Sequence, residues 1–471
     1  MTTSGTTADS GGASGPGPGQ EEGDRPPRPA AGGGRWRWIT GIAVAVVLGT
    51  VGIAAALMST EGYLPGDAMV REWEAPADPQ AEEYGNGSWL AGDTVVRSRF
   101  DALNGYDLRT GAERWEFVPP GRAEICAVDG DGGTGIAVVS YGELRGNPGG
   151  CATASGIDLK TGATLWKAPL TVRTNDMTQA PYTDQVATGG GLAVLRDWDH
   201  RWLPDADPVK DDVGERTPVR GLRAVDARTG EPRWTAGMSE DCFPYQVAAG
   251  EKRVAAILAC DSELRLAVFD PADGAERWTV PLDRRGLDLS AVVSVRSVDP
   301  LVVRFARGEH GDGAFLAFSD EGRPLGRIES AGEHGEFNSE PDDAKVTIAD
   351  GKLFAIVAHP DQSSPNDRVV AFDLEDGRKL WHESFKMYDV LGLHAGGGRV
   401  SVLVNPVRVG TADEDLHVFD ADSGEERDHR AFRDDVDHSS GALQGVHVRG
   451  DTLVVARWGK GVRPLSAYRT W

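Results

Sequence analysis

The sequence predicts an all-β fold, an eight-bladed β-propeller, preceded by one transmembrane helix and a disordered tail. Three observations carry this prediction. A hairpin motif recurs along the chain at a spacing of about 40–50 residues, the length of a propeller blade made of four short strands. A short apolar strand precedes the copies of this motif. One uncharged segment near the N-terminus is long enough to cross a bilayer as a helix.

The recurring motif is a strand that ends in Asp, three residues, a Gly, and a second strand with Trp eight positions after the Asp. An Asp can accept hydrogen bonds from backbone N–H groups within a turn, and Gly can adopt the positive φ that closes it. The Trp is expected to pack against a neighbouring unit, where its large area and its N–H are both used. The intact copies are Asp107, Gly111 and Trp115; Asp158, Gly162 and Trp166; Asp226, Gly230 and Trp234; Asp270, Gly274 and Trp278; and Asp373, Gly377 and Trp381.

Two further copies of the motif are incomplete. The copy around Ser319 and Gly322 is one residue short and has no Trp. The copy at Asp420 and Gly424 has Asp428 in the Trp position. Seven turns of this kind therefore occur, whereas eight apolar strands occur. The eighth strand has no turn after it, because the chain stops before an outer strand of that unit.

The missing outer strand is expected at the other end of the propeller. Residues 70–76 resemble the strand that follows the first turn, with Trp73 in the place of Trp115. A strand from this segment would complete the eighth blade and close the ring, and closure removes exposed sheet edges. Eight blades is the prediction, and seven is the alternative.

The chain divides into a disordered cytoplasmic tail (1–38), a transmembrane helix (39–58), a short linker (59–69) and the propeller (70–471). The tail consists largely of Gly, Ser, Pro and Thr, which cannot bury enough apolar surface to offset chain entropy. The span carries no charged residue.

The orientation follows from the flanking basic residues. Arg25, Arg28, Arg35 and Arg37 precede the span, and the first basic residue after it is Arg71. The positive-inside rule then places the N-terminus in the cytoplasm and the propeller outside, in a single-pass protein of the cytoplasmic membrane. A cleaved signal peptide is the alternative.

The formal net charge is −24, and it lies in the part of the chain that follows the span. A surface of this sign repels nucleic acid and anionic lipid headgroups. We therefore expect no nucleic-acid partner, and the simplest role of the charge is solubility.

The repeats resemble those of the quinoprotein family, in which an xDxxTGxxxW pattern marks each blade. The resemblance covers residues 70–471 and implies a PQQ-type propeller fold. One branch of that family is formed by PQQ-dependent dehydrogenases, and another by noncatalytic assembly factors of the BamB kind. The dehydrogenase branch uses adjacent cysteines in many members, a Glu/Asn/Asp calcium site and an Asp base. This chain has no adjacent cysteines and no motif that assigns the other roles, so we expect neither PQQ nor calcium, and no catalytic residues.

The four cysteines are expected to form two disulfides, Cys126 with Cys151 and Cys242 with Cys260. In each pair the first Cys begins an innermost strand and the second follows the end of its antiparallel neighbour, so the two thiols meet. An even number of cysteines outside the cytoplasm favours oxidation over metal binding.

The longest connections are all expected to join the second strand of a blade to its third, on one side of the ring. The longest of them carries Trp198 and Trp202, which could anchor a partner or pack back onto the rim. Residues 197–199 and 434–437 are acidic but lack the spacing of a calcium loop. The ten histidines are scattered and are interpreted as solvated loop residues, so no metal site is expected.

These patterns favour a noncatalytic scaffold that docks an extracytoplasmic protein or envelope ligand. A membrane-anchored PQQ-dependent dehydrogenase is the first alternative, and a ligand sensor is the second. The fold alone does not separate the three functions.

Overall fold

The computed structural model describes residues 44–54, 68–77, 87–131, 133–142, 151–170, 172–173, 185–199, 220–239, 242–260, 263–282, 292–306, 313–337, 345–358, 368–385, 388–406, 414–433, 443–459 and 461–470. The chain forms two compact units, Met1–Leu57 and Met58–Trp471. In the first unit, residues 44–54 form an exposed helix. Within the ranges just given, no helix has both the length and the apolar character that a membrane crossing requires. The predicted tail, and residues 39–43 and 55–58 of the predicted span, lie outside the described residues.

The second unit is built from mainly antiparallel sheets in which most successive strands pair in chain order. The first three sheets contain β2 (Gly87–Ala91), β3 (Thr94–Ser98), β4 (Leu103–Asp107) and β5 (Glu113–Phe117); β6 (Glu124–Asp131), β7 (Ile136–Gly142), β8 (Thr153–Asp158) and β9 (Thr164–Pro169); and β10 (Val172–Arg173), β11 (Val186–Gly189), β12 (Leu192–Asp199), β13 (Arg220–Asp226) and β14 (Pro232–Gly237). A single turn of 3₁₀ helix, Pro120–Arg122, links the first two of these sheets.

The next three sheets follow the same plan. They contain β15 (Cys242–Ala249), β16 (Val254–Cys260), β17 (Glu263–Phe269) and β18 (Glu276–Pro281); β19 (Val292–Val298), β20 (Leu301–Ala306), β21 (Ala314–Phe318) and β22 (Pro324–Glu329); and β23 (Ala331–Gly332), β24 (Gly335–Phe337), β25 (Val346–Ala349), β26 (Lys352–Ala358), β27 (Arg368–Asp373) and β28 (Lys379–Ser384).

The remaining described strands form one continuous sheet in the order β29-β30-β31-β32-β1-β35-β34-β33. Its members are β29 (Tyr388–Gly396), β30 (Arg399–Pro406), β31 (Asp415–Asp420), β32 (Glu426–Phe432), β1 (Ala68–Glu74), β33 (Leu443–Arg449), β34 (Thr452–Arg457) and β35 (Leu465–Thr470). The strand that carries Trp73 is β1, and it pairs antiparallel with β35 along most of its length. It also makes a short parallel pairing with β32, through Ala68 with Ala431 and Met69 with Phe432.

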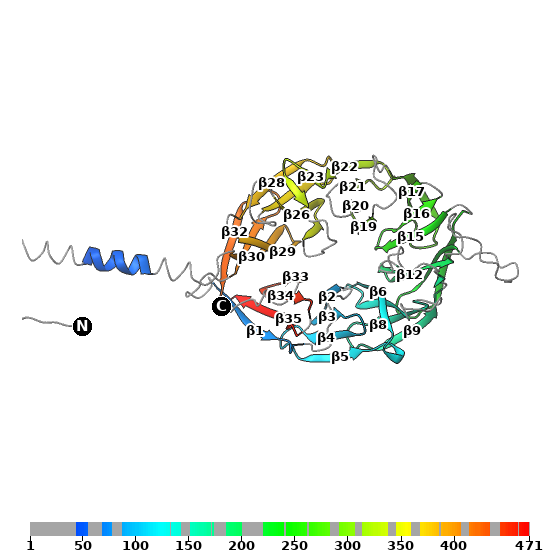
Figure 1. Cartoon of the computed structure of the whole chain (residues 1–471), viewed down its shortest axis with the longest axis horizontal. Helices are drawn as coiled ribbons and strands as arrows, with labels where there is room; N and C mark the ends of the chain where they lie inside the picture. The colour runs from blue at the N-terminus through cyan, green and yellow to red at the C-terminus, as the bar shows by residue number, and fades with distance from the viewer. Residues whose placement is uncertain are drawn as a thin grey trace, which may run out of the picture. The chain divides into compact units, whose positions relative to one another are not determined.

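The sheets of this unit stand around a ring (Figure 1). Strands such as β2, β6, β15 and β29 lie towards the centre, and β5, β9, β28 and β32 lie at the outside. An all-β propeller is therefore confirmed. The second strand of each sheet is packed between two neighbouring sheets, which explains why runs such as Val254–Cys260 are apolar without alternation. Outer strands alternate instead, as in the exposed and buried residues of Glu113–Phe117.

The Asp of each motif organises its turn through several hydrogen bonds. Asp226 Oδ1 accepts bonds from the backbone N–H groups of Arg228 and Thr229 at 3.0 and 2.9 Å, and Gly230 N donates to the Asp226 carbonyl at 2.8 Å. The second carboxylate oxygen accepts a bond from Arg233, on the next strand, at 2.6 Å. The same Asp–Arg bond recurs between Arg114 and Asp107, Arg277 and Asp270, and Arg427 and Asp420.

The Trp of each motif reaches the turn of the following sheet. Trp166 Nε1 donates to the carbonyl of Ala227 at 2.7 Å, and its ring lies over Gly230. A Cβ on Gly230 would sit 2.6 Å from Trp166 Cγ, and this glycine has φ of +73°. The residue therefore must be Gly for two independent reasons. The equivalent indole bonds run from Trp73 to Leu108, from Trp234 to Pro271, from Trp278 to Asp320 and from Trp381 to Ala421.

The two incomplete motifs have structural explanations. Where the Trp is missing after Gly322, Gly326 occupies its place, and its backbone N–H donates to the Leu374 carbonyl at 3.0 Å. A Cβ on Gly326 would lie 2.3 Å from Gly377 N, so backbone packs on backbone here. Asp428 lies on β32, and the next strands in the sheet are β1 and β35. These two strands are not joined by an Asp–Gly turn, so a Trp at position 428 would have no such turn to pack against.

Both predicted disulfides are present, Cys126–Cys151 and Cys242–Cys260. Cys242 and Cys260 are directly opposite each other on β15 and β16, as the antiparallel register predicted. Cys151 lies immediately before β8 and bonds back to β6. Each bridge is attached to the beginning of the innermost strand of its sheet, which lies opposite the end of the second strand.

Replacing Gly230 by Ala should destabilise the propeller more than replacing Gly135 by Ala. Both glycines have positive φ, +73° and +70°, but a Cβ on Gly135 would meet nothing within 4 Å. We expect about 1–2 kcal/mol for the strain at Gly135, and a further 1–3 kcal/mol, roughly, for overpacking against Trp166 at Gly230. Denaturant unfolding of the two variants measures the difference. Equal losses would mean that the Trp contact is not tight.

Stability should also depend on pH through the Asp–Arg bonds. The hydrogen bond from Arg233, together with the turn N–H groups, lowers the pKa of Asp226 to about 2. The folded-state pKa is below the unfolded value of about 3.9, so the stabilisation is complete above about pH 4 and is lost as the pH falls towards about 2. The melting-temperature advantage of the natural chain over Asp226→Asn should shrink across that window. Arg233→Gln should remove the part of the pH dependence that the Arg233 bond supplies, and an unchanged advantage in acid would contradict the assignment.

Candidate functional site

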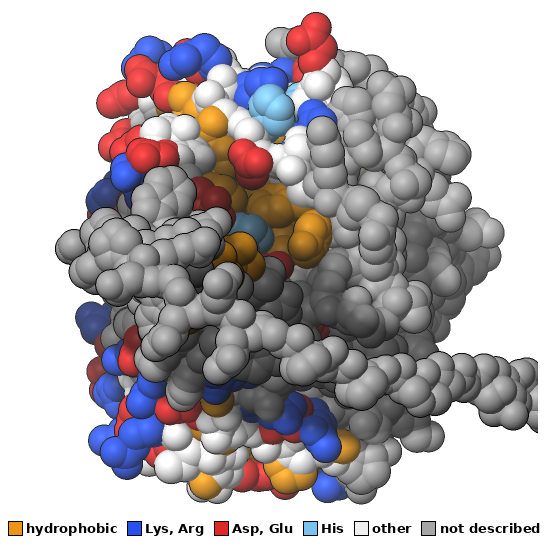
Figure 2. Space-filling view, turned by 90° about the vertical axis from the view of Figure 1, so that its left-hand side faces the viewer, with side chains coloured by type: hydrophobic (Ala, Val, Ile, Leu, Met, Phe, Trp, Pro, Cys, Tyr) orange, Lys and Arg blue, Asp and Glu red, His pale blue; other side chains and the backbone are white. Residues whose placement is uncertain are grey.

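A cleft of about 320 Å³ opens on the outer flank of the ring, between β28 and the hairpin of β31 and β32. Its lining consists of Glu383, Ser384, Phe385, Tyr388, Asp415, His417, Phe419, Gly424, Glu426 and His429. Figure 2 looks at the side of the ring that carries β32, and it shows hydrophobic side chains, with histidine among them, in a hollow bordered by charged residues. The cleft combines the aromatic rings of Phe385 and Phe419 with several titratable groups.

Strand pairing brings the two histidines of the cleft together. His417 on β31 is the direct cross-strand partner of His429 on β32. Asp415 lies two residues before His417, so its side chain leaves the strand on the same face. The Asp420–Gly424 turn fixes this register, because Gly424 N donates to the Asp420 carbonyl at 2.9 Å. These side chains are therefore held by a hairpin and not by a loop.

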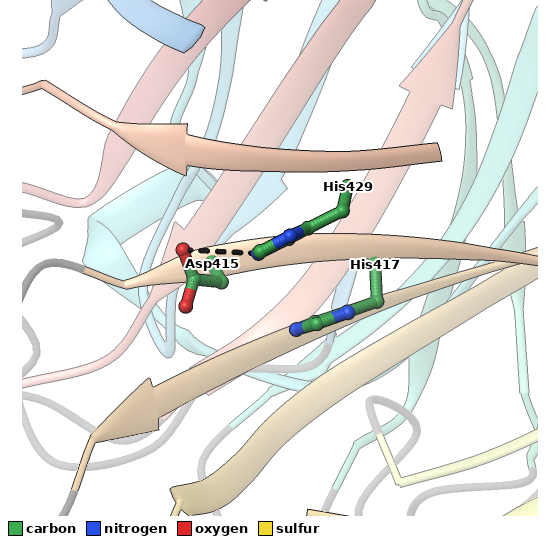
Figure 3. A group of neighbouring side chains, drawn as sticks. All are labelled: Asp415, His417 and His429. Carbon is green, nitrogen blue, oxygen red and sulfur yellow. Dashed lines mark ion pairs between the residues drawn. The ribbon is translucent and has the colours of Figure 1, made fainter. Parts of the chain in front are cut away.

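The two imidazole rings are stacked face to face (Figure 3). Their centroids are 4.3 Å apart and their planes differ by 9°. Phe385 contacts His417 edge-on at 5.1 Å between ring centroids, and the Phe419 ring is parallel to the His417 ring at 6.1 Å. The His417 side chain is 17% exposed and that of His429 is 47% exposed, so one ring is embedded in the floor and the other faces solvent.

Carboxylates contact both rings. His417 Nδ1 lies 2.7 Å from Glu426 Oε1, and His429 Nε2 lies 3.4 Å from Asp415 Oδ1. The bond to Asp415 raises the pKa of His429 above its usual value, against the opposing effect of partial burial. Burial raises the pKa of Tyr388 at the edge of the cleft, and the Asp415 carboxylate adds to that shift. The site thus combines two imidazoles with acceptor oxygens in a half-buried setting.

One ligand atom from each of Asp415, His417 and His429 lies within 4.8 Å of the other two. Within the described part of the chain, these three residues are the group of His, Cys, Asp and Glu donors gathered closely enough to hold a metal ion. Nitrogen and carboxylate donors on adjacent strands can bind a divalent cation or exchange protons with a bound ligand.

His417 lies on β31 and His429 on β32, so the expectation that the histidines are loop residues is wrong for these two, and the cluster was not expected from the sequence. The signal was available. In the repeat at Asp107, the residue three before the Asp pairs with the residue nine after it, Asn104 with Glu116. The same rule applied to Asp420 pairs 417 with 429.

The described lining of the cleft includes neither of the two tryptophans that the sequence suggested as partner anchors. Trp198 belongs to β12, where its backbone pairs with Arg220 and Val172. Trp202 lies outside the described residues, and so do residues 434–437. Asp197 is buried and accepts a bond from Arg223 Nε at 3.0 Å, so its carboxylate serves an ion pair within the sheet. The expectation that the chain holds neither PQQ nor calcium stays a prediction.

Comparison with known proteins identifies the family. The family model described as outer membrane protein assembly factor BamB matches residues 103–383. No curated protein matches the chain.

Three solved structures are among those that match the chain. BamB from Moraxella catarrhalis is 16% identical with a TM-score of 0.47, over 85% of this chain and 100% of that one. The computationally designed Ika8 protein is 13% identical with a TM-score of 0.48, over 84% and 100%. Sqt1 from Saccharomyces cerevisiae is 8% identical with a TM-score of 0.48, over 87% and 100%. The family match spans more than half of the chain and agrees with the repeats read from the sequence: this protein belongs to the family of the outer membrane protein assembly factor BamB.

Proposed function

We propose that this protein is a noncatalytic scaffold. In this proposal an eight-bladed propeller, held at the outer face of the cytoplasmic membrane by one helix, docks an extracytoplasmic protein or an envelope ligand. The family match supports a role in protein interaction in general, since the matching model is that of an assembly factor.

The observation that carries the proposal is the different use of the two sides of the ring. On one side, the Asp–Gly turns are short and the described indole bonds lock them to the preceding sheets. On the other side, long stretches of sequence join β7 to β8, β12 to β13, β26 to β27 and β30 to β31. Elaborated connections on a rigid framework are where binding residues concentrate. The partner is therefore assigned to the side of the long connections.

The count of eight blades rests on the joint between β32 and β1. Two residue pairs connect these strands, whereas β1 and β35 share five. The continuous sheet then consists of two blades in edge contact, one made of β29 to β32 and the other of β33, β34, β35 and β1. Each of the other sheets contributes one blade.

The membrane location rests on the sequence and the disulfides. Residues 39–58 are uncharged, and arginines precede them. Both cysteine pairs of the propeller are bonded, and disulfides persist in oxidising compartments outside the cytoplasm. An N-terminus in the cytoplasm with the propeller outside accounts for both facts.

Shortening the longest connection should abolish partner binding. The test variant replaces residues 200–219 of the full chain with a short Gly–Ser linker. The control carries Arg109→Glu and Lys160→Glu, two exposed residues in turns on the opposite side. After cross-linking in cells, proteins captured with the natural chain should be lost from the linker variant and retained by the control. Both variants should melt like the natural chain. Capture of no partner by the natural chain, or equal capture by the linker variant, would refute the docking assignment.

The topology can be tested with thiol labelling, because all four natural cysteines are bonded. A membrane-impermeant maleimide added to intact cells should label Arg109→Cys, in an exposed turn of the propeller. It should label Ser14→Cys, in the predicted tail, after lysis alone. Labelling of Ser14→Cys in intact cells would reverse the proposed orientation.

A further inference from the structure

We propose that Asp415, His417 and His429 form a binding site for a divalent transition-metal ion of the zinc type. The site is independent of the scaffold role and uses the cleft on the outer flank of the ring. The three ligand atoms are already within 4.8 Å of one another.

The donor set determines the class of metal. Two imidazole nitrogens and one carboxylate oxygen suit Zn²⁺ and its neighbours Cu²⁺ and Ni²⁺. Calcium and magnesium prefer sites made of oxygen ligands alone. The cleft therefore should select transition metals over the alkaline-earth ions that are abundant outside cells.

The hydrogen bond between His417 and Glu426 leaves the other ring nitrogen of His417 free of a proton and able to bind a metal. An ionised Glu side chain can only accept, so His417 Nδ1 must carry the proton that it shares with Glu426 at 2.7 Å. A neutral His417 then has its lone pair on Nε2, the nitrogen at the tip of the ring. Carboxylate–histidine–metal chains of this kind orient the ligands of known zinc sites and raise their basicity.

The other two ligands already face each other. His429 Nε2 lies 3.4 Å from Asp415 Oδ1, so an ion bound to one is in reach of the other. Figure 3 shows the two rings extending towards the side on which Asp415 lies. Zinc ligands lie about 2.0–2.2 Å from the ion, so two of them are about 3.3–3.6 Å apart in a tetrahedral site. Because the two rings are parallel, their in-plane lone pairs do not yet converge, and binding requires the half-exposed His429 ring to turn out of the stack into the space beside it.

The position of the ligands also favours binding. All three are on β31 and β32, whose register is fixed by ladder pairing and by the Asp420 turn. Little chain entropy is lost when a metal binds to side chains that are already held in place. Three protein ligands leave a fourth position open towards the cleft, where water or a ligand from outside could bind.

The test uses the purified full chain, stripped with a chelator and titrated with Zn²⁺ by calorimetry. We expect one equivalent of Zn²⁺ to bind, and the melting temperature to rise in its presence and fall again with chelator. Ca²⁺ and Mg²⁺ should give neither signal. Co²⁺ should bind in place of Zn²⁺ and show the visible absorption of a low-symmetry site with nitrogen and oxygen ligands.

Variants distinguish this cluster from other histidines. His417→Ala and His429→Ala should each weaken Zn²⁺ binding by about tenfold or more, and Glu426→Ala should also weaken it through loss of the orienting bond. The matched control is His382→Ala, an exposed histidine on the neighbouring β28, which should keep full affinity. Metal-free melting temperatures check that the variants fold. Absence of Zn²⁺ binding by the natural chain, or equal losses in His382→Ala and His417→Ala, would overturn the proposal.

Discussion

The ring depends on one repeated interaction, the packing of a Trp indole on the glycine of the next turn, which most of these indoles strengthen with a hydrogen bond to the turn backbone. Each contact joins two sheets that share no ladder, and it buries a large aromatic surface on a glycine that cannot carry a side chain. The Asp of the turn keeps that glycine in position, and an Arg from the outer strand holds the Asp. Local turn chemistry and long-range packing therefore depend on the same few residues.

Much of this framework could be predicted because the residue types of the motif determine the local backbone conformation. Asp and Gly at a fixed spacing predict the turn, and the cysteines at Cys242 and Cys260 follow from the register of the strands between them. The role of Gly326 could not be predicted, since nothing in the sequence says that a backbone N–H would replace an indole. That substitution depends on how closely two sheets approach, which is a property of the assembled ring.

The cleft shows a different limit on what could be predicted from the sequence. His417 and His429 are far enough apart in the chain to look unrelated, and neither belongs to a known metal motif. Their proximity follows from the pairing rule of the hairpin, which the repeats contain but which the Asp, Gly and Trp positions of the motif do not display. The contribution of Phe385 could not be inferred in this way, because it comes from the preceding sheet and its contact with His417 depends on how two blades pack.

The closure of the ring by β1 has a consequence for synthesis. Glu74 and Ser466 are neighbours in space, yet 392 residues separate them in the chain. While the protein is being made, β1 emerges before the other described strands and its main partner β35 is made last, so most of its N–H and C=O groups are available to other strands for most of that time. The pairing of β1 with β35 therefore forms only after the whole propeller has been made. A chain that stops earlier keeps an open sheet edge and remains a target for chaperones and proteases.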